Sequence, residues 1–130
     1  MASKKRIFIV DDDEVILESL RRLLTLAGFE AGAVRDSKEV ITRIKVFKPQ
    51  LILLDLLMPG LGGFEICEIL NSDKQTSGIP IIILSALGDP VDIKRAYRLG
   101  VVGYLAKPYD FNELLKEIQK ALIYKDGAAP

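Results

Sequence analysis

The stretch Leu51-Ile52-Leu53-Leu54-Asp55 joins four consecutive apolar residues to one carboxylate. A run that is apolar at every position, rather than at alternate positions, is typical of a strand that helices cover on both faces. The stretch 81–84 repeats this pattern and is followed by Ser85. We therefore expect both runs to be central strands of a parallel sheet.

Short apolar runs alternate with segments of helical spacing along the whole chain. The predicted strands cover residues 7–10, 29–34, 51–54, 80–84 and 101–106. The predicted helices cover residues 14–27, 37–47, 63–70, 90–99 and, after the cap Asp110, 111–123. Because a helix lies between successive strands, the pattern predicts an α/β fold with a doubly wound, five-stranded parallel sheet.

The first two predicted helices have distinct start and stop signals. Five apolar residues of the first helix share one face and are expected to be buried: Ile16, Leu20, Leu23, Leu24 and Ala27. Gly28 supplies a left-handed end to that helix. The second helix is expected to begin at the cap Ser37 and to end before Pro49, which disfavours helical backbone at Lys48.

The composition excludes several classes of protein. With 49% apolar and 28% charged residues, the chain should form one folded domain. Eighteen basic and eighteen acidic residues cancel, so we expect no direct contact with nucleic acid. The longest apolar runs have four residues, far fewer than the roughly 18 that a membrane-spanning helix needs.

Histidine is absent, and Cys67 is the single cysteine. An imidazole-activated nucleophile and an internal disulfide are therefore excluded. The basic stretch 1–6 precedes only four apolar residues, too few for a signal peptide, so we expect a cytoplasmic protein. Chemistry in this chain must use carboxylates, hydroxyls and lysine.

Polar residues follow four of the predicted strands at the point where each strand ends. These are Asp11–Asp13, Asp55, Ser85 and Lys107. Carboxylates brought together need a cation, or one of their pKa values must rise, since two unit charges about 4 Å apart repel by about 4 kcal/mol at an effective dielectric constant of about 20. Mg²⁺ prefers such oxygen ligands, while a hydroxyl and a lysine can bind phosphate. The set predicts a phosphoryl-transfer site with a carboxylate nucleophile.

Four motifs carry a resemblance to a known family. They are Ile7–Val10 followed by Asp11-Asp12, the stretch LLDLLMPG at 53–60, ILSA at 83–86 and GYLAKP at 103–108. Together they resemble the receiver domain of bacterial response regulators (CheY-like) over about residues 5–123, with residues 1–4 and 124–130 as flexible termini. The resemblance implies a flavodoxin-like sheet with strand order 2-1-3-4-5.

The resemblance also implies roles for the acidic residues. Asp55 would accept a phosphoryl group from a phosphohistidine on a sensor histidine kinase or a histidine phosphotransfer protein. Asp12, Asp55 and the backbone carbonyl of Leu57 would bind Mg²⁺, and Asp11 would assist through water. The chain would then be a signalling domain that promotes its own phosphoryl transfer rather than an enzyme with a separate substrate.

Other residues would respond to the phosphoryl group. The Ser85 hydroxyl, the Ala86 amide and the Lys107 ammonium would contact its oxygens, and the bond between Lys107 and Pro108 should be cis. Tyr104 matches the aromatic switch residue of the family. The switch would repack the surface formed by the fourth helix, last strand and last helix, which would contact an effector domain or a downstream protein.

The sequence departs from the common family pattern in three places. Leu57 and Leu87 are both apolar, so neither side chain can orient a hydrolytic water, and we expect slow self-dephosphorylation. The stretch 101–103 lacks acidic residues before the aromatic position, so either a monomer or a phosphorylation-dependent dimer is compatible with it. No effector domain is predicted after residue 124, as in a stand-alone receiver or one cut from a longer regulator.

Two alternatives remain open on the sequence. Asp11-Asp12-Asp13 also fits the aspartate-x-aspartate signature of haloacid-dehalogenase-like phosphatases, with Asp11 as nucleophile and Asp13 as general acid. That interpretation leaves Asp55 without a role. The second alternative is a receiver that is never phosphorylated and serves as a docking module.

Overall fold

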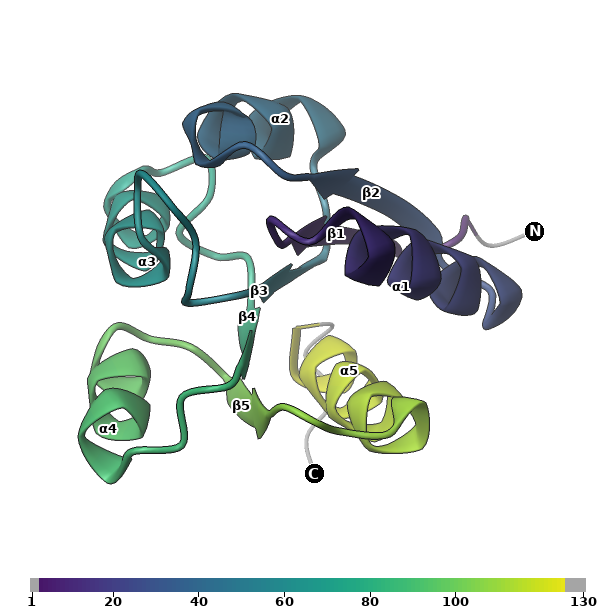
Figure 1. Ribbon diagram of the computed structural model, residues 1–130. Helices are drawn as coiled ribbons and strands as arrows, with labels where there is room; N and C mark the ends of the chain where they lie inside the picture. The colour runs from purple at the N-terminus through teal and green to yellow at the C-terminus, as the bar shows by residue number, and fades with distance from the viewer. Residues whose placement is uncertain (1–2, 126–130) are drawn as a thin grey trace.

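The computed structural model describes residues 3–125 and places helices on both faces of one central sheet (Figure 1). The strands are β1 (Arg6–Val10), β2 (Glu30–Val34), β3 (Leu51–Leu54), β4 (Ile81–Ser85) and β5 (Gly103–Ala106). The α-helices are α1 (Glu14–Leu26), α2 (Val40–Phe47), α3 (Gly63–Ser72), α4 (Pro90–Arg98) and α5 (Phe111–Lys125), and a 3₁₀ turn at Ser37–Glu39 precedes α2. The predicted α/β fold is confirmed.

All neighbouring strands pair in parallel, in the order β2-β1-β3-β4-β5. This is the order that the resemblance implied. The register pairs Val10 with Leu54 and Leu54 with Ile83, so β1, β3 and β4 end at the same edge. That edge therefore receives the residues that follow each strand.

Two separate cores explain why the central strands are apolar at every position. Ile52 and Leu54 pack with residues of α2, α3 and α4 on one face of the sheet. Leu51 and Leu53 pack with residues of α1 and α5 on the other face. Figure 1 shows the same division, with α2, α3 and α4 on one side of the strands and α1 and α5 on the other. The inference of two-sided burial from the sequence is confirmed.

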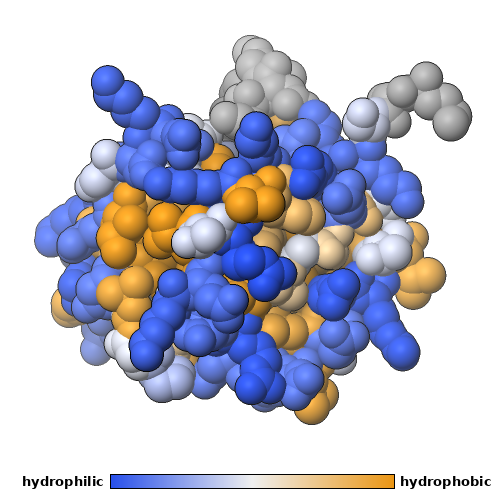
Figure 2. Space-filling view, turned by 90° about the horizontal axis from the view of Figure 1, so that it is seen from above, coloured by the Kyte–Doolittle hydropathy of each residue, from blue (hydrophilic) through white to orange (hydrophobic). Residues whose placement is uncertain are grey.

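The surface above α2 is mixed in polarity. Figure 2 views the molecule from that side and shows hydrophobic residues both on the side where α3 lies and to the right of the centre, with hydrophilic side chains between them and around most of the rim. Exposed hydrophobic residues of this kind are normal, because apolar atoms contribute much of the accessible surface of a folded protein. Within residues 3–125, no helix has the length and apolar character needed to cross a bilayer.

The buried face of α1 differs from the predicted one. Leu17, Leu20 and Leu24 are buried, at i, i+3 and i+7. Leu23 is exposed, and Ala27 is the exposed C-terminal cap, so the prediction was wrong for both. Only Leu17, Leu20 and Leu24 of α1 are buried in the core on this face of the sheet, so the buried face is narrower than the set of apolar residues in the helix. Gly28 has φ +99°, which confirms the left-handed end.

The start of the second helix also needs correction. Asp36, not Ser37, is the cap of the 3₁₀ turn. The Asp36 carboxylate accepts a hydrogen bond from the Lys38 amide at 2.9 Å. Either residue type can cap a helix, and the tertiary contacts of Ser37 decide between them. The helix ends at Phe47 as predicted, with Lys48 in the left-handed region.

The C-terminal boundary is later than predicted. Helix α5 runs to Lys125, two residues past the expected domain end at 123. Residues 1 and 2 and residues 126–130, which belong to the predicted flexible termini, lie outside the described part of the chain.

Candidate functional site

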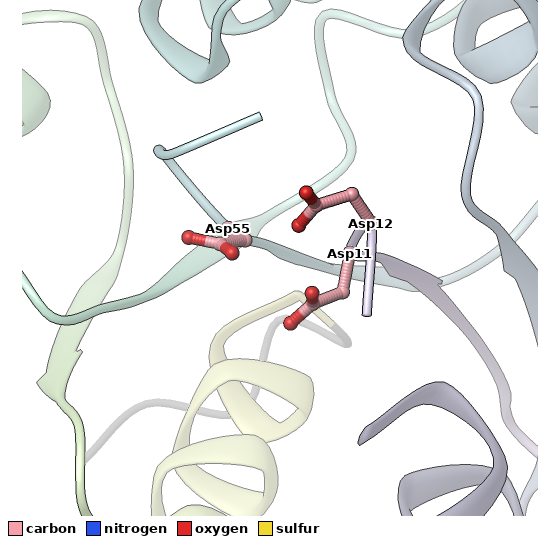
Figure 3. Close-up of side chains that lie close together, drawn as sticks. All are labelled: Asp11, Asp12 and Asp55. Carbon is pink, nitrogen blue, oxygen red and sulfur yellow. The ribbon is translucent and has the colours of Figure 1, made fainter. Parts of the chain in front are cut away.

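Three carboxylates meet at the carboxyl edge of the sheet. Asp11 and Asp12 follow β1, and Asp55 follows β3. One oxygen of each lies within 4.8 Å of the others, and Figure 3 shows the three groups pointing toward one region. Asp11 is 3% exposed and Asp55 6%, whereas Asp12 is open to solvent. The acidic cluster is thus partly buried, with Asp12 on the side that faces water.

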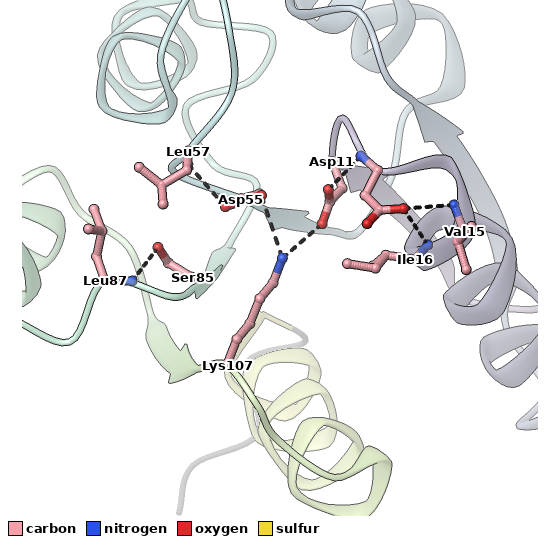
Figure 4. Close-up of polar contacts among 9 residues, drawn as sticks. Asp11, Val15, Ile16, Asp55, Leu57, Ser85, Leu87 and Lys107 are labelled. Atoms are coloured by element: carbon pink, nitrogen blue, oxygen red, sulfur yellow. Dashed lines mark hydrogen bonds and ion pairs between the residues drawn. The ribbon is translucent and has the colours of Figure 1, made fainter.

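Lys107 supplies the positive charge beside this cluster. It follows β5, and its Nζ lies 3.1 Å from Asp11 Oδ2 and 3.5 Å from Asp55 Oδ2 (Figure 4). The peptide bond between Lys107 and Pro108 is cis, as expected. One ammonium, paired with Asp11 and Asp55, lies beside a cluster of three acidic residues, so acidic groups are in excess and favour a bound cation.

Backbone groups hold the other oxygens of the two buried carboxylates. The Leu57 amide donates to Asp55 Oδ1 at 3.0 Å, and the Asp13 amide donates to Asp11 Oδ1 at 2.9 Å. Each buried carboxylate therefore has one oxygen fixed by its own loop and the other directed at Lys107. Such bonds orient the carboxylates before any ligand arrives.

The site changes the titration of its buried groups. Burial raises the pKa of Asp55 above its usual value, although the Leu57 amide and the Lys107 ammonium act in the opposite direction. Burial alone would lower the pKa of Lys107, but the hydrogen bond and charge of Asp11, together with the charge of Asp55, raise it overall. Lys107 is therefore a cation at neutral pH.

The donor set fits a hard divalent cation. Asp11, Asp12 and Asp55 offer oxygen ligands only, and Asp12 leaves the solvent side accessible. Mg²⁺ takes one or two carboxylates and keeps several waters, so an open oxygen-lined edge suits it. The Leu57 carbonyl belongs to the loop that follows Asp55.

The residues after β4 form a second polar group at the same edge. Ser85 is fully buried, and its Oγ accepts a hydrogen bond from the Leu87 amide at 3.1 Å (Figure 4). Tyr104 is half-buried, and its hydroxyl donates to the Leu87 carbonyl at 2.5 Å. Ser85 and Tyr104 therefore both bind the backbone of Leu87, while Ala86, which lies between Ser85 and Leu87 in the sequence, is exposed.

Sequence reasoning missed the backbone of Leu87 as the link between Ser85 and Tyr104. Every residue type except proline offers the same amide and carbonyl, so the side chain at this position gave no signal of its role. The Ser37 hydroxyl was missed for a different reason, because its contact lies on a loop 22 residues away.

A comparison with known families decides the assignment. The model of the "Response regulator receiver domain" family matches residues 7–119. The chain belongs to this family. Receiver domains are parts of two-component signalling systems, so the strand-end residues lie in a signalling domain.

Curated relatives of this receiver are longer regulators. "DNA-binding response regulator MtrA" of Mycobacterium tuberculosis is 34% identical over 123 residues, covering 95% of this chain and 53% of that protein. "Probable transcriptional regulator ycf27" of Cyanophora paradoxa is 37% identical over 120 residues, covering 92% of this chain and 49% of that protein. The receiver thus spans about half the length of these relatives.

Solved structures resemble the receiver over nearly its whole length. A receiver domain protein (CheY-like) from Methanospirillum hungatei has a TM-score of 0.90 at 27% identity, covering 98% of this chain and 100% of the other. Chemotaxis protein CheY4 of Vibrio cholerae has a TM-score of 0.87 at 27% identity, covering 92% and 100%. Both support the CheY-like flavodoxin fold.

Family membership removes the phosphatase alternative, and the geometry of Asp13 agrees. Its carboxylate accepts hydrogen bonds from the amides of Val15 (2.9 Å) and Ile16 (3.3 Å) and so caps α1. Figure 4 shows Val15 and Ile16 at the start of α1, on the far side of Asp11 from Asp55. The carboxylate that the phosphatase interpretation needs as a general acid is thus a helix cap.

Proposed function

We propose that Asp55 of this receiver accepts a phosphoryl group, in the cytoplasm, from a phosphohistidine on a sensor histidine kinase or a histidine phosphotransfer protein. The observation that carries the proposal is the position of Asp55. Its carboxylate is nearly buried, lies beside Asp11 and Asp12, and has the Lys107 ammonium 3.5 Å away.

The transfer exchanges one bond to phosphorus for another. An oxygen of Asp55 forms a bond to phosphorus while the bond between phosphorus and the imidazole nitrogen breaks, and the imidazole leaves with that electron pair. Negative charge on the phosphoryl oxygens is met by Lys107, which already lies between Asp11 and Asp55. The Leu57 amide holds Asp55 in place for the attack.

The acidic residues are the proposed magnesium ligands. Asp12, Asp55 and the Leu57 carbonyl would hold Mg²⁺ directly, with Asp11 assisting through water. A bound Mg²⁺ would neutralise charge on the phosphoryl oxygens and on the carboxylates. This assignment rests on the oxygen-only donor set and on the negative local charge.

The proposed output passes through Leu87. A phosphoryl group on Asp55 would draw the Ser85 hydroxyl, the Ala86 amide and Lys107 toward its oxygens. Because Ser85 and Tyr104 bind the same residue, movement of Ser85 would alter the Tyr104 contact. The surface of α4, β5 and α5 would then change its packing and its affinity for an effector domain or a downstream protein.

We propose that this chain receives the phosphoryl group, passes the signal to an effector domain or a downstream protein, and makes no direct contact with DNA. The relatives named as DNA-binding regulators are about twice its length. The equal numbers of basic and acidic residues favour a protein partner over a phosphate backbone. A monomer and a phosphorylation-dependent dimer are both compatible with this role.

Labelling with acetyl phosphate and Mg²⁺, followed by intact-mass measurement, tests the proposal. The native chain should gain one phosphoryl group, and EDTA should prevent the reaction. Asp55→Asn should remain unlabelled, while Asp11→Asn should still react, although more slowly.

Two results would contradict this proposal. A label that survives in Asp55→Asn would return the nucleophile role to Asp11. A native chain that stays unlabelled at saturating Mg²⁺ would favour the docking module.

A further inference from the structure

Ser37 joins two loops that the sequence keeps far apart. Its side chain is buried, and its Oγ accepts a hydrogen bond from the Leu61 amide at 3.1 Å and donates one to the Pro59 carbonyl at 3.2 Å. Both partners belong to the loop between β3 and α3, which begins directly after Asp55. The hydroxyl thus bridges two peptide groups of this loop.

The hydroxyl is committed to this loop and not to its own helix. Asp36 caps the 3₁₀ turn through Lys38, so Ser37 is not needed there. A serine hydroxyl has one hydrogen to donate, and Ser37 gives it to Pro59. Because the buried hydroxyl both donates to Pro59 and accepts from Leu61, it stabilises the loop conformation in which both hydrogen bonds form.

Gly60 lies between the two bonded peptide groups and makes the contact feasible. Its φ is +82°, a region that side chains disfavour. A Cβ at Gly60 would lie 2.9 Å from Ser37 Oγ, which is closer than such atoms approach in proteins. The loop therefore needs a glycine here both for its turn and to admit Ser37.

The same loop carries the backbone of Leu57. The Leu57 side chain is 50% exposed, so its own packing does little to hold its backbone in place. On one side the loop is closed by the Gly63 amide, which donates to the Leu56 carbonyl at 3.2 Å. On the other side, Ser37 anchors Pro59 and Leu61.

We propose that Ser37 is a positioning residue for magnesium binding. By holding the loop after Asp55, it keeps the Leu57 carbonyl in place relative to the carboxylates. Partners that orient the ligands of a metal commonly contribute about 10-fold or more to its affinity. The inference rests on the proposed function, since it takes the Leu57 carbonyl as a magnesium ligand.

The test compares Ser37→Ala with a matched loss of another buried hydroxyl. Thr76 is also buried, and its Oγ1 donates to the Leu70 carbonyl at 2.7 Å, but it lies in the turn after α3. Thr76→Val is therefore the control for a general loss of stability. Amide NMR shifts during titration with MgCl₂ measure the dissociation constant, and hydrogen exchange without Mg²⁺ measures protection of the Leu61 amide.

Ser37→Ala should weaken Mg²⁺ binding about 10-fold and speed exchange at Leu61, while Thr76→Val keeps native affinity. Native affinity in Ser37→Ala would overturn the inference, as would an equal loss in Thr76→Val. If Ser37→Ala does not fold, Ser37→Cys replaces it in the test, because a thiol keeps the shape of the side chain and forms weaker hydrogen bonds. Ser37→Cys should likewise weaken Mg²⁺ binding, and native affinity in this variant would overturn the inference.

The native chain in this titration separates the two proposals. If the native chain binds Mg²⁺ and is labelled at Asp55, while Ser37→Ala binds equally well, the positioning role alone is wrong. If the native chain does not bind Mg²⁺, the proposed metal site is wrong and the positioning role is overturned with it.

Discussion

At the scale of single residues, the charge of Asp55 works against folding. Burial raises its pKa, which means that the folded chain holds the charged carboxylate less readily than the unfolded chain does. Asp55→Asn removes this charge while keeping the shape of the side chain. We expect the variant to increase the free energy of unfolding by about 1 kcal/mol at pH 7 in EDTA, measured by urea denaturation.

The sign of the pH dependence follows from the same shift. Below the ordinary pKa of 3.8, the carboxyl is protonated in both states and imposes no penalty. As the pH rises through the raised pKa of the folded state, folding must hold a charge that the unfolded chain carries freely. The advantage of Asp55→Asn should therefore grow as the pH rises above 3.8 and level off once the pH exceeds the raised pKa of the folded state.

A matched control for this prediction is Asp89→Asn. Asp89 is exposed and caps α4 by accepting a hydrogen bond from the Val91 amide at 2.9 Å, a role that asparagine can also fill. We expect its stability to stay within about 0.5 kcal/mol of native at every pH. Parallel pH curves for the native chain and Asp55→Asn would contradict the prediction.

Leu57 and Leu87 should set the lifetime of the phosphorylated state. Figure 4 shows both at the same edge of the sheet as Asp55 and Ser85. Their apolar side chains cannot orient a water for hydrolysis. Leu57→Asn combined with Leu87→Glu should shorten the lifetime of the acyl phosphate about 10-fold or more, measured by loss of label after acetyl phosphate is removed.

Leu26→Asn is the control for that experiment, since Leu26 is exposed at the end of α1. It should leave the lifetime unchanged. An unaltered lifetime in the double variant would show that the two leucines do not limit hydrolysis.

At the scale of helices, the end of α1 depends on one backbone conformation. Gly28 has φ +99°, and a Cβ there would meet nothing within 4 Å. Gly28→Ala should therefore lower the free energy of unfolding by about 1 kcal/mol through backbone strain alone. Gly88 has equally open surroundings but no positive φ, so Gly88→Ala should be neutral. Equal effects of the two substitutions on urea denaturation would contradict this account.

Helix boundaries show where sequence patterns suffice and where they do not. The stop at Gly28 and the end before Pro49 follow from local backbone constraints and were predicted correctly. The choice of Asp36 over Ser37 as cap was not predicted, because both residue types cap helices and the loop at Pro59 engages Ser37. Likewise, exposure of Leu23 depends on how α1 lies against the sheet.

At the scale of the whole molecule, the order of the strands assembles the site. Lys107 and Asp11 are 96 residues apart in sequence, yet their side chains approach to 3.1 Å. The two cores on either side of the sheet fix β1 and β3 as neighbours, and the strand ends then share one edge. A site built this way needs the complete sheet, and no isolated segment of the chain contains it.

The sequence by itself determined the alternation of strands and helices, the two-sided burial of the central strands and the residues available for chemistry. These follow from periodicity and side-chain type, which are local properties. Only the tertiary structure decided that Lys107 lies between Asp11 and Asp55, that Leu87 joins Ser85 to Tyr104 and that Ser37 holds the loop after Asp55. The bond between Ser85 and the Leu87 amide is local, but the contacts of Lys107, Tyr104 and Ser37 each join different elements or loops. These contacts depend on strand order and packing, which no local pattern encodes.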